Sequence, residues 1–347
     1  MNGPIHIVGA GATTAAGLDA RQTLASFRAA HSALEETLLF DDKLVVQISA
    51  VIPAHAAKAE TPFAWLRNLA ARALSNALAG TNKPASQTAV IMTLPESFRS
   101  HPAFDANPRA TFLKSVIRET KHDFNAASIQ IDGGAAAVIH AVEIAAEMLH
   151  HPGIAQVIVG GVDNLVNKYD IARLGEARRL KNAENAQGLV PGEGSAFVNL
   201  ALRPNQHAPY SATINNVAVF SERDAALTTR YSQGRAMLDA LRKAASGPGP
   251  AEPQINFVVS NGNGERYGAL EALIYRSRFY RTRREILPTA YPAMTVGDIG
   301  AASGALALMV AADSLTKGYA PGPVAMVEVA SEGGLRAAAV VSRVGVR

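Results

Sequence analysis

Four glycine-rich turns are the most informative feature of this sequence for chemistry. They lie within residues 129–141, 258–268, 296–308 and 330–340, and each follows an apolar segment typical of a buried strand. In open α/β sheets, ligands bind at the carboxyl ends of the strands. The pattern therefore predicts that these four turns, although distant in sequence, meet at one site.

Motifs for a cofactor, a metal or a common nucleophile are absent or weak. The chain has no Cys, which excludes disulfides, thiolate metal sites and a Cys nucleophile. It has no GxSxG, HExxH or P-loop sequence, and its nine histidines show no ligand spacing. Gly9 and Gly11 begin a GxGxxG pattern, but Thr14 replaces its third glycine. Both glycines therefore favour a tight strand-to-helix turn, and we expect no cofactor and no metal.

Strand and helix signals alternate along the chain, which predicts a parallel or mixed sheet covered by helices on both faces. The expected strands are 5–8, 44–52, 88–93, 128–132, 156–159, 212–220, 255–260, 324–330 and 335–341, and the expected helices are 18–30, 62–78, 137–150, 224–245 and 301–315. The alternation restarts after the loop 203–209. This loop is the candidate boundary between two similar halves, 1–204 and 205–347.

Composition and charge narrow the class of protein. Hydrophobic residues make up 48% and charged residues 18% of the 347 residues, with a net charge of +4, which excludes a disordered chain. No segment reaches the ~18 apolar residues of a membrane span, and the N-terminal residues lack the basic region of a signal peptide. We expect a cytoplasmic protein. The densest basic cluster, 276–284, includes aromatic residues, a combination that nucleic-acid-binding proteins use. We favour two other interpretations, a solvent-exposed connecting segment or a surface that pairs with acidic partners.

Seven segments stand in an order and spacing that resemble one family. They are IVGAGATTAAG, IDGGAAAVIHAVEIAAEML, VIVGGVDN, GLVPGEGSAFVNLA, VVSNGNG, MTVGDIGAASGAL and SEGGLRAAAV. Together they resemble the β-ketoacyl-ACP synthases, the condensing enzymes of the thiolase fold, over nearly the whole chain. The resemblance implies an α/β protein with a thiolase-like fold, in which two similar halves form a five-layered αβαβα architecture. It also implies a two-fold dimer.

The positions that carry catalysis in this family are replaced here. The resemblance places Ala135 at the Cys nucleophile, and alanine cannot accept an acyl chain. It places Asn261 and Asp298 at the two histidines, where an anionic Asp298 would repel the developing enolate. It places Glu332 in the last glycine-rich turn, whose backbone N–H faces the thioester. We expect these four residues to mark a vestigial site without a catalytic residue.

Asp298 and Glu332 leave one catalytic alternative open. Paired carboxylates in a closed pocket can split their pKa values and work as acid and base. We favour a structural interpretation, in which the two carboxylates cap helix N-termini or pair with Arg266, because Asp298 precedes a predicted helix. The turn 263–267 would provide the pairing, with Glu265 or Arg266 as the bridge between loops.

Five stretches, GGVDN, GLVPGEGSAF, NGERYG, GDIGAASG and SEGGLRAAAV, resemble a divergent ketosynthase-like subgroup found beside type VI secretion components. This resemblance implies a catalytically inactive accessory protein that binds a secretion effector or adaptor. One alternative is a chain-length-factor-like subunit that pairs with an active ketosynthase and contacts acyl carrier protein. Another is an acyl-thioester enzyme with altered chemistry. We expect a homodimer or heterodimer, and neither a nucleic-acid nor a membrane partner.

Overall fold

The computed structural model describes residues 3–346 except 41–45, 57–58, 80, 82, 105–109, 206–207, 229 and 248. Its strands are β1 (Ile5–Thr14), β2 (Glu35–Phe40), β3 (Val46–Ser49), β4 (Thr88–Leu94), β5 (Ile129–Asp132), β6 (Gln156–Asn164), β7 (Glu193–Ala201), β8 (Ala212–Ser221), β9 (Phe257–Ser260), β10 (Thr289–Ala290), β11 (Val324–Ala330) and β12 (Leu335–Arg343). Strands β2 and β3 form a small separate hairpin. The others form one sheet in the order β10-β9-β11-β12-β8-β1-β7-β6-β4-β5.

The large sheet consists of two halves with the same pattern of pairing. In one half, β4 pairs in parallel with β5 and β6, and β7 then pairs antiparallel with β6 and β1. In the other, β9 pairs in parallel with β10 and β11, and β12 then pairs antiparallel with β11 and β8. In the large sheet, the halves join where β1 meets β8, over three residue pairs. The same strand pattern therefore occurs twice.

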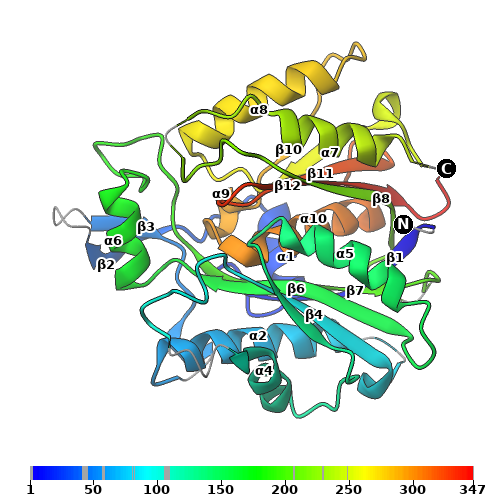
Figure 1. Cartoon of the computed structure of the whole chain (residues 1–347), viewed down its shortest axis with the longest axis horizontal. Coiled ribbons are helices and arrows are strands. Elements are labelled where there is room, and N and C mark those ends of the chain that lie inside the picture. Colours follow the sequence, from blue (N-terminus) through cyan, green and yellow to red (C-terminus); the bar gives the residue numbers. More distant parts are fainter. Residues whose placement is uncertain are drawn as a thin grey trace.

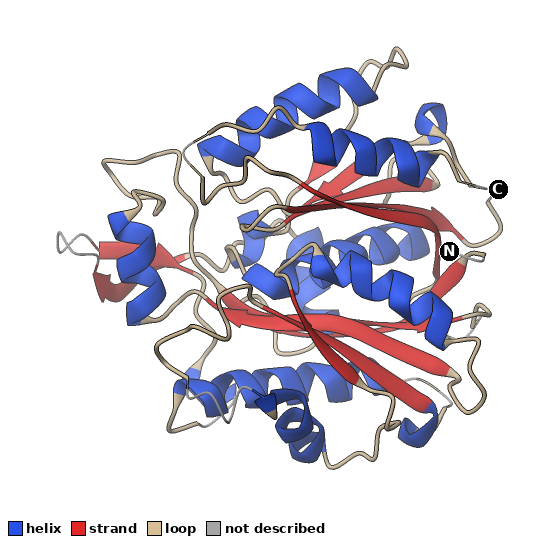
Figure 2. Ribbon diagram, viewed as in Figure 1, coloured by secondary structure: helices blue, strands red, loops and turns tan. Residues whose placement is uncertain are grey.

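Helices make the remaining three layers (Figures 1 and 2). Helices α2 (Pro62–Leu78) and α4 (Phe112–Thr120) cover the outer face of the first half-sheet, and α7 (Arg235–Ala245) and α8 (Arg266–Phe279) cover that of the second. Helices α5 (Ala137–Met148) and α10 (Ser303–Lys317) lie between the two half-sheets. This is the five-layered αβαβα arrangement that the family resemblance implied. No helix in the described part of the chain is long and apolar enough to cross a membrane.

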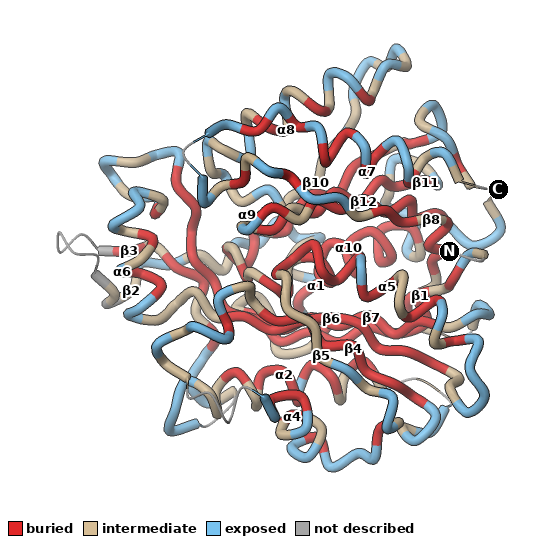
Figure 3. The backbone as a smooth tube through the Cα atoms, in the orientation of Figure 1, coloured by how far each residue is buried: buried red, intermediate tan, exposed pale blue. Residues whose placement is uncertain are grey.

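Helix α10 of the middle layer is almost entirely buried (Figure 3). Every residue of α10 from Gly304 to Leu315 is buried, and most of them are small or aliphatic. A Cβ atom on Gly304 would lie 2.2 Å from the carbonyl oxygen of Ala135, beside the start of α5. The glycine therefore allows the two central helices to approach each other where the glycine-rich turns meet.

Gly9 and Gly11 do not form the turn that the sequence analysis expected. Both lie inside β1, which continues to Thr14. A Cβ atom on Gly11 would lie 1.9 Å from the carbonyl oxygen of Ala73 in α2. Strand β6 likewise runs through Gly160 instead of ending there. These glycines permit close packing of neighbouring backbones. The sequence analysis interpreted them as the ends of strands, because it could not see this tertiary requirement.

The other predicted helices and strands are confirmed in part. The helix over Pro62–Leu78 is confirmed, and the Oγ1 of Thr61 caps it by accepting the N–H of Ala64 at 3.1 Å. The helix expected over 224–245 begins only at Arg235, since 222–234 is mostly loop. Part of the expected strand 44–52 lies outside the described residues, and the rest contains β3. Strand β2 and helices α4, α8 and α6 (Lys168–Glu176) were not predicted. Helix α8 has no apolar periodicity by which it could be identified.

Candidate functional site

A cavity of about 160 Å³ lies where the four glycine-rich turns meet. Its lining includes Ala135 after β5, Asn261 after β9 and Asp298 before α10, together with Glu332 after β11. The prediction that these turns converge is confirmed. All four positions that the sequence analysis selected therefore share one pocket.

Ala135 forms a buried wall of this cavity at the entry to α5. The backbone turns into the helix through Gly133 and Gly134, whose φ angles are +137° and +66°. The hydroxyl of Ser331 donates to the carbonyl of Gly133 at 2.7 Å and accepts the N–H of Ala136 at 2.8 Å. Ser331 thus fastens the turn after β11 to the start of α5. What Ala135 presents to the cavity is a methyl group.

The side-chain amide of Asn261 is hydrogen-bonded to the backbone of the neighbouring strand. Its side-chain amide donates to the carbonyl of Ala330 and accepts the N–H of the same residue, both at 2.9 Å. This pair of hydrogen bonds extends the pairing of β9 and β11 by one more step. The amide therefore retains one N–H that could serve a ligand.

Asp298 is also held by the protein on both carboxylate oxygens. Its Oδ1 accepts the N–H of Gly300 at 2.9 Å, and its Oδ2 accepts the amide of Asn263 at 2.7 Å. Burial raises the pKa of Asp298, and these hydrogen bonds only partly oppose that effect. The carboxylate thus binds an N–H of the short turn 300–302 before α10, but it is not the expected helix cap, because Ile299 and Ala302 hold the cap positions of that turn and of α10 without a side-chain cap hydrogen bond. It does not bind Arg266, whose side chain is exposed.

Glu332 lies between two arginines, neither of which is Arg266. Arg173 contacts its Oε1 at 3.0 Å, and Arg179 contacts the same oxygen. Burial alone would raise the pKa of Glu332, but the two guanidinium groups outweigh it and hold the pKa below its ordinary value. The expected role of Glu265 as a bridge is present, since it binds Arg179 at 2.6 Å.

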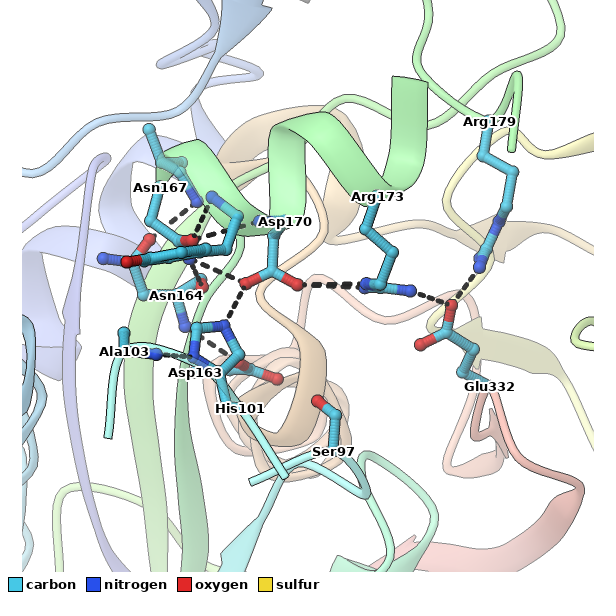
Figure 4. A network of polar contacts seen from close by, with 12 residues as sticks. Ser97, His101, Ala103, Asp163, Asn164, Asn167, Asp170, Arg173, Arg179 and Glu332 are labelled. Carbon is cyan, nitrogen blue, oxygen red and sulfur yellow. Dashed lines mark hydrogen bonds and ion pairs between the residues drawn. The ribbon is translucent and has the colours of Figure 1, made fainter. Parts of the chain in front are cut away.

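Helix α6 carries Asp170 and Arg173, which connect Glu332 to further polar side chains (Figure 4). Asn167 caps the helix by accepting the N–H groups of Tyr169 and Asp170, both at 3.0 Å. Asp170 then binds Arg173 one turn later at 3.1 Å, and His101 at 3.0 Å. The sequence analysis missed this chain of contacts. Its signal was the Asp and Arg spaced three residues apart behind an Asn cap.

Two further carboxyl groups of the cavity lining have raised pKa values. Asp163, at the end of β6, accepts the N–H groups of Asn164 at 2.8 Å and Ala301 at 2.9 Å, and burial raises its pKa well above the ordinary value. Glu96 accepts the N–H of Gly333 at 2.6 Å, and burial raises its pKa as well. The pocket thus contains carboxyl groups with raised pKa values beside Glu332, whose pKa is lowered.

The chemistry open to this arrangement is limited. The carboxyl groups and guanidinium groups bind one another or the backbone, and Ala135 offers no nucleophile. The cavity is smaller than the roughly 300–1,000 Å³ usual for small-molecule pockets. Within the described residues, no three His, Asp or Glu side chains gather as a metal site.

Comparison with known proteins gives structural relatives and no sequence relatives. No protein-family model matches the chain, and no curated protein matches it. The oxazolomycin ketosynthase domain OzmH KS7 of Streptomyces albus JA3453 superimposes with a TM-score of 0.77 at 16% identity, covering 98% of this chain and 74% of that one. The type II PKS complex AntDE:AntF, an acyl-carrier protein with its hexaketide-bound ketosynthase, gives 0.78 at 13% identity, covering 99% of each chain.

A third structure is that of the ketosynthase ApeO from Xenorhabdus doucetiae in complex with its chain length factor ApeC. It superimposes with a TM-score of 0.72 at 14% identity, covering 99% of this chain and 98% of that one. Likeness at such low identity establishes the fold and nothing finer. The chain therefore has the thiolase-like fold of ketosynthases.

Proposed function

We propose that this chain is a catalytically inactive, ketosynthase-like accessory protein that acts by binding another protein. One observation carries the proposal. Where the resemblance expects reacting groups, the pocket has the methyl group of Ala135, and Asn261 and Asp298 are already hydrogen-bonded by the protein. The proposed role is a cytoplasmic one.

The energetic argument against condensation is cumulative. Covalent catalysis needs an activated nucleophile, and Ala135 has no group that could form an acyl intermediate. Each hydrogen-bond donor that stabilises a developing oxyanion is worth about 3 kcal/mol, and a carboxyl group at position 298 has the wrong charge when ionised. Restoring the nucleophile alone would therefore leave most of the catalytic stabilisation missing.

The leading candidate for the partner is a type VI secretion effector or adaptor. Its support is the resemblance of the five stretches that include GGVDN and GDIGAASG. In this role the thiolase-like fold would serve as a scaffold, and the network around Glu332 would keep the old pocket ordered without a substrate.

A chain-length-factor-like subunit is the second candidate. Its support is the structural likeness to complexes of a ketosynthase with a chain length factor and with an acyl-carrier protein. This role predicts a heterodimer with an active ketosynthase. The net charge of +4 would suit an acidic carrier protein.

An acyl-thioester enzyme with altered chemistry is the third candidate. It is favoured by the opposite pKa directions of Asp298, which is raised, and Glu332, which is lowered. Hydrolysis of acyl-CoA or acyl-ACP by the purified chain, lost in Asp298→Asn and kept in Glu285→Gln, would support this candidate against the leading one.

The lack of condensing activity is tested with the purified chain and its Ala135→Cys variant. Both are incubated with acyl and malonyl thioesters, and ketoacyl product is measured by mass spectrometry. We expect no product from either protein. Appreciable product from Ala135→Cys would overturn the proposal, because it would show that the remaining groups still support condensation.

The partner class is tested by affinity purification of the tagged protein from its native host at endogenous level. Recovery of an effector, adaptor or spike protein supports the secretion role. Recovery of a ketosynthase with acyl carrier protein supports the chain-length-factor role instead. Recovery of neither, with a monodisperse monomer in solution, contradicts both.

A further inference from the structure

Exposed hydrophobic side chains concentrate around helix α8. Among the large hydrophobic residues that the structure describes, five are more than half exposed. Four of them belong to α8 or to the segments beside it, namely Leu227, Tyr231, Leu273 and Ile286. Leu273, in the middle of the helix, is 68% exposed. Single exposed leucines are common, but a cluster indicates an interaction site.

The loop that carries Leu227 and Tyr231 lies beside α8 on the outer layer of the second half-sheet, and the loop that carries Ile286 follows the end of this helix. The ring of Tyr231 stacks against that of Tyr267, with 6.3 Å between centroids. Farther along the helix, Arg278 donates to the carbonyl of Gln233 at 3.2 Å. The loop therefore runs along α8, and Figure 1 shows this helix at the edge of the molecule. We call the exposed residues of 222–235 and 266–286 the α8 face.

The α8 face is strongly basic. Its exposed charged side chains, among described residues, are one acid, Glu285, and seven arginines, Arg223, Arg230, Arg235, Arg266, Arg278, Arg281 and Arg283. In the part of the chain that the structure describes, none of these seven forms an ion pair. Desolvating unpaired guanidinium groups is unfavourable unless a partner supplies carboxylates.

The basic cluster 276–284 divides into two groups. Arg276 points inward and binds the fully buried Glu328 at 2.6 Å, and Tyr275 and Tyr280 donate to the same carboxylate at 2.8 and 2.7 Å. Arg284 binds Glu252 at 2.6 Å. These contacts fix the helix and the loop after it. The exposed arginines between them are therefore displayed on a rigid support.

The outward positions of α8 follow helical spacing. Arg266, Ala269, Leu273 and Ser277 are exposed at intervals of three or four residues, which places them on one side of the helix. The helix has 14 residues, about 21 Å at 1.5 Å per residue. This length suits a second helix of about four turns laid against it.

We propose that the α8 face docks an acidic, amphipathic helical segment of a partner protein. The carboxylates of the segment pair with exposed arginines such as Arg266 and Arg281, and its apolar side covers Leu273. The inference rests on the proposed protein-binding role and names the chemistry of the partner. A protein is favoured over nucleic acid because three of the four exposed hydrophobic residues are aliphatic, whereas bases stack on aromatic rings.

The test uses a fluorescein-labelled helical peptide with Glu along one side and Leu along the other, and follows its anisotropy as the full chain is added. We expect Arg281→Glu/Arg283→Glu to weaken binding at least about tenfold, and most strongly at low salt. Leu273→Ser should weaken it about threefold to tenfold, with little dependence on salt. The control Arg118→Glu, on an exposed arginine of α4, should stay within about twofold of the unmodified chain.

Two further probes decide between partner classes. A peptide with Lys in place of Glu should not bind, and single-stranded oligonucleotide should not displace the acidic peptide. The proposal is overturned if Arg118→Glu weakens binding as much as the α8 variants do. Equal affinity of Leu273→Ser and the unmodified chain, together with displacement by oligonucleotide, would also overturn it and favour nucleic acid.

A second measurement separates this inference from the proposed function. The tagged Arg281→Glu/Arg283→Glu variant is purified from the host beside the Arg118→Glu control. If both variants retain the same protein partner, the binding role stands and the α8 face is not its site. If the unmodified chain turns over acyl thioesters, the proposed function fails, while the peptide titration still decides the fate of the α8 face.

Discussion

The pocket and the α8 face are both rich in arginine, yet they use it in opposite ways. In the pocket, Arg173 and Arg179 bind Glu332, and Arg336 binds Glu271, so each guanidinium group has a carboxylate of the same chain. On the α8 face, the seven exposed arginines have no such partner among the described residues.

The contrast bears on the proposal that the surface, and not the pocket, carries the binding function. Charges that neutralise one another inside a pocket contribute to the order of the fold and leave little for a ligand. Charges on a rigid surface that have no partner within the chain are available to bind another molecule. The comparison supports the proposal that this protein binds a partner at its surface and that the pocket has a structural role, and the substitutions below test this division.

The largest effect is expected from breaking the most buried pair. Arg336 and Glu271 are 1% and 3% exposed, and both carboxylate oxygens lie 3.0 Å from the Nε of Arg336. Arg336→Met leaves Glu271 buried without a counterion, so urea denaturation should show a loss of about 3–5 kcal/mol. The double variant Arg336→Met/Glu271→Met should recover much of this loss. A single-variant loss below about 1 kcal/mol would contradict a structural role for the pocket.

Glu193 is a buried carboxyl group that accepts hydrogen bonds from the neutral donors Trp65 and Ile52, and it should titrate near neutrality. Burial raises its pKa to about 7, although Trp65 donates to it at 2.6 Å and the N–H of Ile52 at 2.8 Å. Because the folded pKa is raised, the associated stability is present below pH 4.5 and is lost as the pH rises to about 7, by roughly 2–3 kcal/mol.

Trp65 provides a direct readout, since it is the only tryptophan in the chain. We expect its fluorescence to titrate with a midpoint near 7, and this step should vanish in Glu193→Gln. The matched variant Glu285→Gln should keep it. An unchanged titration in Glu193→Gln would mean that the fluorescence reports another group.

A smaller effect is expected from Glu332→Gln. The pKa of Glu332 is lowered in the folded protein, so its contribution is present above the ordinary pKa and is lost as the pH falls through the folded value. The side chain is 31% exposed, which limits the difference from the unmodified chain to about 1 kcal/mol at neutral pH. Denaturation at neutral and acid pH should show this difference shrinking on acidification. A difference that grows in acid would reverse the assignment.

The smallest effect should come from the α8 face itself. Leu273→Ser and Arg281→Glu/Arg283→Glu alter exposed side chains without intramolecular partners in the described structure, so the free energy of unfolding should change by less than about 0.5 kcal/mol. Thermal and urea unfolding measure it. A larger loss would show that these residues support the fold, and the contrast between the two regions would then fail.

Local patterns were sufficient for many elements and for the place of the site. Apolar spacing, with Pro62 at the first turn, predicted Pro62–Leu78, and the glycine-rich turns after apolar strands predicted one shared pocket. These predictions succeed because a helix start or a strand end depends on neighbours in sequence. The resemblance to the condensing enzymes, and not a local pattern, selected Ala135, which the structure has in the lining of this pocket.

Tertiary structure decided the rest, because the deciding contacts join distant residues. Gly11 looked like a turn, yet it is needed for the approach of Ala73 in α2. Glu332 was expected near Arg266 and instead binds Arg179, which is 153 positions away in the chain. The sequence around a charged residue does not indicate its ion-pair partner, because the pair depends on which loops the fold brings together. The alternation of strands and helices predicted a helix-covered sheet, the glycine-rich turns predicted the pocket and the family resemblance implied the five layers, whereas the fold alone determined which arginines turn inward and which remain exposed.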